Sequence, residues 1–142
     1  VELSGLAGEL VVPPEWLAEI APNALREQFA RSPYAVSFQT ADTTVILVTM
    51  HVLYGDKPGD RIPELTAIAR WMAEWAQQTH RWHHNLMLLG DFNIDRLGDP
   101  LYQAFTSTGL AVPEALNAVS GMCREPGMCP CAWAVADRLS IN

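Results

Sequence analysis

Long hydrophobic runs are missing from this 142-residue chain, and basic residues are few. No apolar stretch approaches the roughly 18 residues that a membrane-spanning helix needs, so the sequence predicts no membrane span. Nine Lys and Arg residues stand against sixteen Asp and Glu residues, which gives a formal charge of −7. A surface of that sign does not attract nucleic acid through its overall field. Binding of a polyanion would therefore depend on a local basic strip or on metal ions.

Cysteine is scarce and confined to one place, because Cys123, Cys129 and Cys131 lie within nine residues. Their spacing lacks the paired Cys-x2-Cys elements and the fourth ligand of common zinc sites, so we interpret them as incidental. The chain has no internal repeats and no signal-peptide pattern at its start. The missing signal pattern favours a cytoplasmic location. The chain begins at Val1 rather than at a methionine, however, so secretion stays open.

The apolar pattern predicts an α/β (α+β) domain. Residues 34–39 alternate as a strand does, and residues 44–51 are almost wholly apolar, as expected of a strand covered on both faces. Residues 65–78 show helical spacing, with Glu64, Arg70 and Glu74 mostly facing away. Asp99-Pro100 is a cap followed by a first-turn proline, and it predicts a short helix over residues 101–108.

The remaining segments are less regular. Residues 1–32 are loosely patterned, with short helices expected at 15–20 and 23–30. The connector at 79–84 contains His80, His83 and His84. We favour a solvated loop there over a metal cluster, because no nearby carboxylate completes a ligand set.

The most informative stretch is Asn-Leu-Met-Leu-Leu-Gly-Asp-Phe-Asn at residues 85–93. Its apolar run predicts a buried strand that Gly90 ends. Because side chains alternate along an extended chain, Asp91 and Asn93 point the same way while Phe92 turns into the core. A carboxylate and a carboxamide side by side are oxygen ligands for a hard cation such as Mg²⁺. The alternative is an ordinary turn, in which Gly, Asp and Asn are also common.

His51 ends the strand at 44–51 as Asp91 ends the later one. If the two strands are neighbours, His51, Asp91 and Asn93 converge on one rim of the sheet. An imidazole beside a metal-bound carboxylate is suited to donating to a phosphate oxygen. Alone, His51 is equally typical of a strand-end histidine bonded to the backbone.

Several motifs occur together and in a recognisable order. They are Arg31-Ser-Pro-Tyr34, Phe38, Thr49-Met-His51-Val, Tyr54-Gly55, Arg61, Glu64 and Gly90-Asp-Phe-Asn93. In this combination the chain resembles the endonuclease/exonuclease/phosphatase superfamily, the deoxyribonuclease I-like fold, over roughly residues 24–118. The resemblance implies a four-layer αββα sandwich of two mostly antiparallel mixed sheets, and the use of Mg²⁺ or Mn²⁺.

The same resemblance implies roles for four residues. Asp91 corresponds to the active-site aspartate that holds or activates the attacking water near the metal, and Asn93 to the asparagine that orients the water or the phosphate. His51 corresponds to the histidine that contacts the scissile phosphate. Arg31 corresponds to a basic position that pairs with phosphate in some members, although a surface salt bridge explains it equally well.

The chain also departs from the family. An early Asn and a Glu metal ligand have no match, since Glu2, Glu9 and Glu15 lack the expected strand context. The family's late Asp-His pair is absent, because Asp137 is followed by Arg138. We therefore expect residues 1–142 to be a single partial domain, with flanking segments missing and an aberrant tail at 121–142, as a frameshift would produce.

The predicted function is metal-dependent phosphodiester hydrolysis by water attack on phosphorus, with nucleic acid or a small phosphoester as substrate. Because ligands are missing, we expect this chain alone to be nearly inactive. One alternative is an inactive relic or interaction module with the same fold. Another is a phosphatase or phospholipid-headgroup phosphodiesterase, which the acidic net charge favours over a nuclease.

Overall fold

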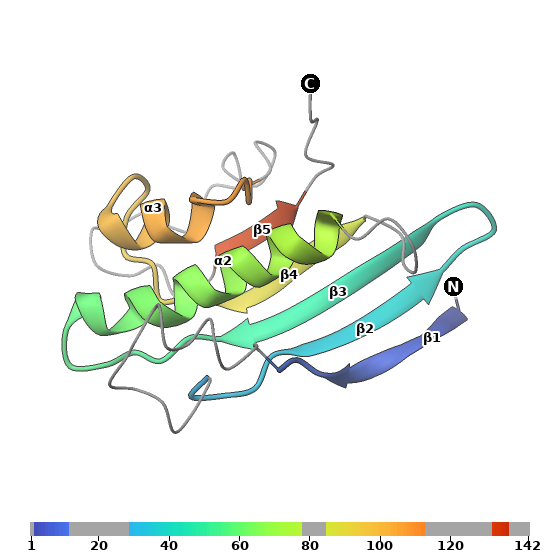
Figure 1. The fold of residues 1–142 in the computed structure, drawn as a ribbon, viewed down its shortest axis with the longest axis horizontal. Coiled ribbons are helices and arrows are strands. Elements are labelled where there is room, and N and C mark those ends of the chain that lie inside the picture. Colours follow the sequence, from blue (N-terminus) through green and yellow to red (C-terminus); the bar gives the residue numbers. More distant parts are fainter. Residues whose placement is uncertain (1, 12–28, 78–84, 113–131, 137–142) are drawn as a thin grey trace.

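The computed structural model describes residues 2–11, 29–77, 85–112 and 132–136. These residues form one five-stranded sheet in the order β1-β2-β3-β4-β5, with two α-helices and one 3-10 helix (Figure 1). The strands are β1 (Glu2–Glu9), β2 (Tyr34–Gln39), β3 (Thr44–His51), β4 (Leu86–Asp91) and β5 (Ala132–Ala136). The helices are η1 (Pro58–Arg61), α2 (Ile62–Gln77) and α3 (Pro100–Thr106).

The sheet is mixed, with one parallel pairing among antiparallel ones. β1 and β2, β2 and β3, and β4 and β5 pair antiparallel, whereas β3 and β4 pair in parallel. Parallel neighbours need a long crossover, and α2 provides it. The expected α+β class with a mostly antiparallel mixed sheet is confirmed, and the described residues supply one sheet and one helical layer of the predicted sandwich.

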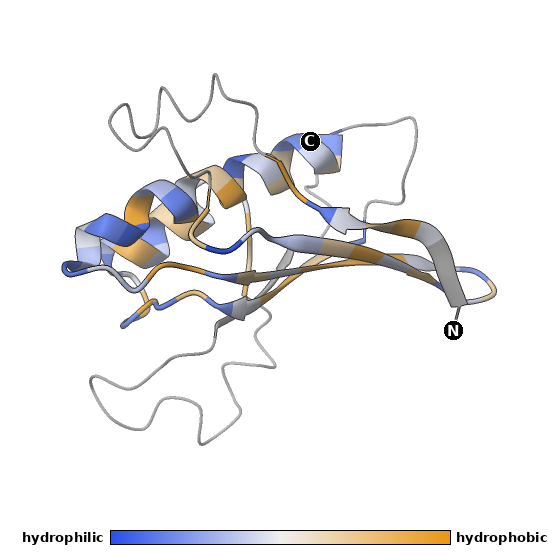
Figure 2. Cartoon of the chain, turned by 90° about the horizontal axis from the view of Figure 1, so that it is seen from below, coloured by the Kyte–Doolittle hydropathy of each residue, from blue (hydrophilic) through white to orange (hydrophobic). Residues whose placement is uncertain are grey.

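One face of the sheet forms the core. Ile46, Val48, Leu86 and Leu88 are fully buried beneath α2, which contributes Leu65, Ile68 and Met72 to the same cluster. Figure 2 shows α2 lying along one side of the sheet. The buried strand residues are two positions apart, as expected of a strand with one face in the core. The buried helix residues follow the helical stripe predicted for residues 65–78.

The opposite face is less well covered than the sequence predicted. Val45, Leu47, Met87 and Leu89 are only half-buried. In the part of the chain that the structure describes, the coverage expected on both faces of the strand at 44–51 is thus complete only on the α2 side. Among the described residues no helix lies on that side of the sheet.

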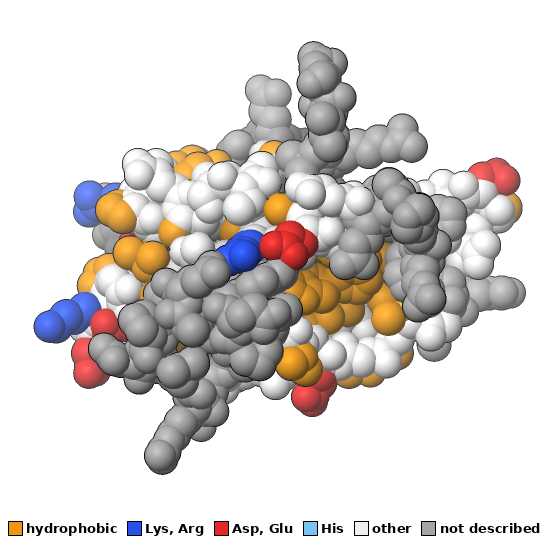
Figure 3. All heavy atoms as spheres, viewed as in Figure 1, with side chains coloured by type: hydrophobic (Ala, Val, Ile, Leu, Met, Phe, Trp, Pro, Cys, Tyr) orange, Lys and Arg blue, Asp and Glu red, His pale blue; other side chains and the backbone are white. Residues whose placement is uncertain are grey.

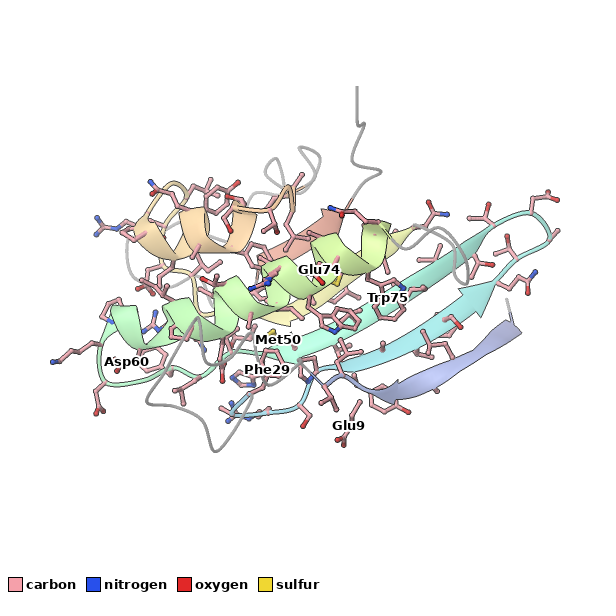
Figure 4. The ribbon with its side chains drawn as sticks, viewed as in Figure 1. Glu9, Phe29, Met50, Asp60, Glu74 and Trp75 are labelled. Atoms are coloured by element: carbon pink, nitrogen blue, oxygen red, sulfur yellow. The ribbon has the colours of Figure 1, made fainter. Side chains whose placement is uncertain are left out.

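Coverage of the helical face also falls off toward β1. Trp71 and Trp75 form an edge-to-face pair with ring centroids 4.4 Å apart, and both are only partly buried. In the space-filling view an area of hydrophobic side chains lies uncovered beside α2 (Figure 3), near the position where Figure 4 labels Trp75.

The two ends of the chain differ from the predictions. The loosely patterned start contains β1, which the sequence analysis missed because Gly5 and Gly8 weaken a strand pattern. Glu2 and Glu9 therefore lie in a strand after all. Within the predicted tail, β5 pairs with β4, although no element was expected there. The expected helix at 15–20 and residues 23–28 of the one expected at 23–30 lie outside the described residues, and residues 29–30 are not helical. The three connector histidines, the cysteines and Asp137 also lie outside the described residues.

Smaller predictions hold with shifted bounds. The long helix begins at Ile62 rather than Leu65 and ends at Gln77. The Asp99 cap is confirmed, because its side chain accepts a hydrogen bond from Tyr102 N at 2.7 Å. No helix in the described part of the chain has the length and apolar character needed to cross a membrane.

Candidate active site

The candidate site lies where β3 and β4 end side by side. In the parallel register His51 stands opposite Asp91, and Met50 stands opposite Gly90. The carboxyl ends of two adjacent parallel strands thus bring an imidazole and a carboxylate to one rim, as the sequence predicted. Both side chains belong to the alternation that faces away from α2.

His51 and Asp91 face each other without a direct hydrogen bond. His51 Nε2 lies 3.8 Å from Asp91 Oδ2, and the two side chains are 48% and 28% exposed. That distance is too long for a hydrogen bond. It does let the oxygen of one water molecule lie about 2.8 Å from both groups at once, donating to the carboxylate and bonding to the imidazole. Solvent can reach both groups.

Gly90 holds the two strand ends together rather than ending the strand. β4 continues through Gly90 to Asp91, so the predicted end of the strand was one residue early. Gly90 has φ +154°, and a Cβ at this position would collide with the carbonyl group of Met50 in β3. The missing side chain therefore permits the close approach of β3 and β4 directly beside the candidate site.

Phe92 separates the two predicted ligands and anchors them. It is fully buried, and its ring packs on that of Phe105 from α3 with centroids 4.6 Å apart. Asp91 and Asn93 remain partly exposed on either side of it. The predicted burial of Phe92 is confirmed, whereas the extended backbone expected through Asn93 is not found, because Asn93 has φ +50°.

Asn93 is held in one conformation by its neighbours. Its φ is +50°, a left-handed geometry that Asn adopts more readily than most residues. Its backbone N–H donates to Asp91 Oδ1 at 3.0 Å, and its Nδ2 donates to Val52 O at 2.8 Å. The second bond orients the carboxamide, and no described residue donates to its Oδ1. This oxygen is available to a ligand.

Arg31 is placed on the same rim by topology. It precedes β2, whose first residue Tyr34 pairs with Thr49 near the end of β3. Arg31 is exposed, and the structure shows no ion pair between its side chain and another described residue. The alternative of a surface salt bridge thus finds no partner among those residues. A phosphate-binding role stays a prediction.

The donors fit a hard cation by type but not by number. Asp91 and Asn93 supply a carboxylate and a carboxamide oxygen. Within the described ranges, no group of three or more His, Cys, Asp or Glu side chains is arranged to hold a metal ion. Glu9 ends β1 at the same rim as Tyr34, but it does not complete such a group. The described residues alone do not form a complete metal centre.

Sequence analysis missed the parts played by Arg61 and Glu64. Arg61 is buried and binds the loops that follow β3 and β4, and Glu64 accepts two backbone N–H bonds. The prediction that Glu64 mostly faces away from the protein was wrong. The local sequence gives no signal of these contacts, because α2 carries a second pair of opposite charges, Arg70 and Glu74.

Comparison with known proteins places this geometry in context. No family model matches the chain. A deoxyribonuclease of Thioalkalivibrio sp. (strain K90mix) is 31% identical over 70 residues, which cover 48% of this chain and 19% of that protein. The chain thus spans about a fifth of the length of the curated relative that it matches.

Two solved structures are similar in shape. Sphingomyelinase C from Streptomyces griseocarneus aligns with a TM-score of 0.50 at 16% identity, over 75% of this chain and 42% of that one. Beta toxin 275-280 from Staphylococcus aureus aligns with a TM-score of 0.44 at 11% identity, over 56% of this chain and 29% of that one. The first similarity shows a shared fold. The sequence match and the shared fold each cover only part of the protein compared.

Proposed function

We propose that this chain is part of a phosphodiester hydrolase domain whose reaction takes place at the rim formed by His51, Asp91 and Asn93. The observation that carries the proposal is the register of β3 and β4, which brings His51 Nε2 to 3.8 Å from Asp91 Oδ2. The partial match to a protein named deoxyribonuclease supports the same chemistry.

The residues divide the work by their chemistry. Asp91 accepts a hydrogen bond from the attacking water and turns it toward phosphorus, while the Asn93 carboxamide fixes the water or a phosphate oxygen. His51 donates to a phosphoryl oxygen and stabilises the charge that develops there. Arg31 adds a positive charge for the phosphate. These roles follow from donor and acceptor types at the rim.

A divalent cation would be held by Asp91 and Asn93, with further ligands from outside the described residues. Mg²⁺ or Mn²⁺ bound there would neutralise phosphate charge and polarise the phosphorus centre. Mg²⁺ commonly uses one or two protein carboxylates and keeps several waters, so a donor set of this type would serve once further ligands are present.

The test is hydrolysis of bis(4-nitrophenyl) phosphate with and without Mg²⁺, comparing the native chain with Asp91→Ala. We expect very slow hydrolysis by the native chain, because its described residues provide an incomplete ligand set. Rapid hydrolysis that Asp91→Ala abolishes would disprove the inactivity and still support the site. Hydrolysis that is unaffected by Asp91→Ala would refute the proposed site.

A second candidate is a non-catalytic module with the same fold. The absence of a complete metal-binding group among the described residues favours it. Calorimetric titration with Mg²⁺ separates the two proposals. A catalytic domain should bind Mg²⁺ in a manner that Asp91→Ala eliminates, whereas a non-catalytic module should show no binding that depends on Asp91.

The substrate is either nucleic acid or a smaller phosphoester. The formal charge of −7 favours the smaller class, because a duplex would meet net repulsion. Competition for the site between a short single-stranded oligonucleotide and glycerophosphocholine, each measured at two salt concentrations, would distinguish them.

A further inference from the structure

Two oppositely charged side chains at the start of the crossover helix contact all the segments that carry the predicted site residues. Arg61 is the last residue of η1, and Glu64 lies in the first turn of α2. Their partners are mainly backbone groups of three segments far apart in the sequence. These segments lie next to Arg31, directly after His51, and directly after Asp91.

Arg61 joins the loops that follow β3 and β4. Its side chain is only 3% exposed. Nε donates to Tyr54 O at 2.6 Å, and Nη1 donates to Asn93 O at 2.6 Å and to Asp95 Oδ2 at 3.2 Å. The guanidinium also lies 4.3 Å from the centre of the Tyr54 ring. A cation this buried is stabilised only when such partners replace water, so its contacts fix the two loops relative to each other.

Glu64 joins the loop after β3 to the segment before β2. Oε1 accepts from Ala30 N at 2.6 Å, and Oε2 accepts from Leu53 N at 2.8 Å. Ala30 is the immediate neighbour of Arg31, and Leu53 lies two residues after His51. Both carboxylate oxygens are thus used, each on a different segment. Hydrogen bonds to a charged acceptor are the stronger kind.

We propose that Arg61 and Glu64 are positioning residues that set the relative placement of Arg31, His51, Asp91 and Asn93. The inference rests on the proposed function, because the placement of these four residues matters for catalysis only if they form the active site. Arg61 acts through Asn93, since it holds the carbonyl group of the residue whose N–H binds Asp91. Glu64 acts through the backbone beside Arg31 and His51. The parallel pairing of β3 and β4 sets His51 opposite Asp91. Arg61 and Glu64 then fix the segments that follow these strands and the segment that precedes β2.

The same helix offers a matched control pair. Arg70 and Glu74 carry the same two charges, lie on α2, and bind each other with Nε and Oε1 3.3 Å apart. Figure 4 shows Glu74 well along α2 from its start, where Asp60 is labelled. Arg70→Met and Glu74→Gln therefore remove the same two charges as Arg61→Met and Glu64→Gln do, and they leave the hydrogen bonds of Arg61 and Glu64 to the loops in place.

The experiment is amide hydrogen exchange on the ¹⁵N-labelled 142-residue chain. We expect Arg61→Met to speed exchange at Asn93 about tenfold, and Glu64→Gln to speed it about tenfold at Leu53 and Ala30. Amides of the β3–β4 ladder report global stability in the same spectra. Arg70→Met and Glu74→Gln should change exchange at the three loop amides less than about twofold.

The His51 imidazole resonances provide a readout that general destabilisation does not move. We expect them to shift in Arg61→Met and Glu64→Gln at fixed pH, and to stay unchanged in the two control variants. Arg61→Lys should not restore the native spectrum, because an ammonium group cannot span the acceptors that the guanidinium reaches. If Arg61→Met does not fold, Asp95→Asn removes one partner of Arg61 and should give a smaller change at Asn93, about threefold.

The outcomes separate this inference from the proposed function. Unchanged exchange at Asn93 and Leu53, or exchange that rises equally across the β3–β4 ladder, would overturn the positioning roles. Titration with inorganic phosphate and Mg²⁺ tests the function independently. Failure of Asp91→Ala to alter the phosphate response of the native chain would refute the site, even where local exchange confirms the positioning.

Discussion

The two faces of the sheet are built from similar residues, but one forms the core and the other carries the candidate site residues. Toward α2, Val48 and Leu88 are completely buried, whereas Leu47 and Leu89, one position along, are half-buried. Hydrophobicity alone does not distinguish these neighbours. The predicted chemistry lies at the end of the less covered face, where His51 and Asp91 point. Stability and function are thus assigned to opposite faces of the same strands.

The largest expected effect concerns Phe92, which packs on Phe105 of α3 and lies between two residues of the site. Phe92→Ala should lower the free energy of unfolding by about 3–5 kcal/mol, because it leaves a cavity against Phe105. Urea denaturation measures this loss. Asp91→Ala is the control from the opposite face, and it should lower stability far less. Similar losses in the two variants would contradict the proposal that stability depends on one face of the sheet and function on the other.

A direct comparison of the faces is possible with two adjacent leucines in β4. Leu88→Ala should destabilise the protein by about 2–5 kcal/mol, as expected for a fully buried leucine. Leu89→Ala should destabilise it by only about 1 kcal/mol, because its side chain already contacts solvent. Both are measured by urea denaturation. Equal losses would indicate that something covers the second face in solution, and sedimentation would show whether that is another copy of the chain.

Gly90 tests whether the close approach of β3 and β4 beside the candidate site contributes to stability. Gly90→Ala should destabilise by about 1–3 kcal/mol, because the new Cβ collides with the Met50 carbonyl and φ is +154°. Gly8→Ala in β1 is the control, since no atom lies within 4 Å of a Cβ there. Thermal unfolding of both variants checks this prediction. A Gly90→Ala protein as stable as Gly8→Ala would show that the close approach of β3 and β4 is not required.

The smallest effect on stability is expected for His51. His51→Gln should change the free energy of unfolding by less than about 1 kcal/mol, because the pair with Asp91 is largely exposed and 3.8 Å apart. Phosphate binding, followed by calorimetry with Mg²⁺ present, should nevertheless be lost. Thr49→Ser, on the same strand and face, should leave both properties unchanged. A stability loss above about 2 kcal/mol in His51→Gln would instead give the histidine a structural role.

Much of this architecture was predictable because its signals are local. Strands β2 and β3 follow the two-residue period, α2 follows the helical period, and Asp99 with Pro100 marks the start of α3. The convergence of His51 and Asp91 was predictable only on the condition that their strands are neighbours. The sequence does not state that condition, and the parallel pairing supplies it.

The features that escaped prediction depend on contacts between distant residues. Arg61 binds Asn93 O across 32 positions, and Glu64 binds Ala30 N across 34. Nothing in the local pattern distinguishes these side chains from Arg70 and Glu74, which pair farther along α2. β1 escaped for a different reason, since two glycines and a bulge interrupt the alternation of an edge strand.

The crossover between β3 and β4 has a consequence for how the protein acquires its site. His51 and Asp91 are separated by a complete helix, so the chain must close a long loop through α2 before the two residues can meet. Neither strand can bring the two groups together by a simple hairpin. The rim therefore depends on a long-range pairing of the kind that forms slowly, and a chain in which β3 and β4 fail to pair keeps both residues without bringing them together.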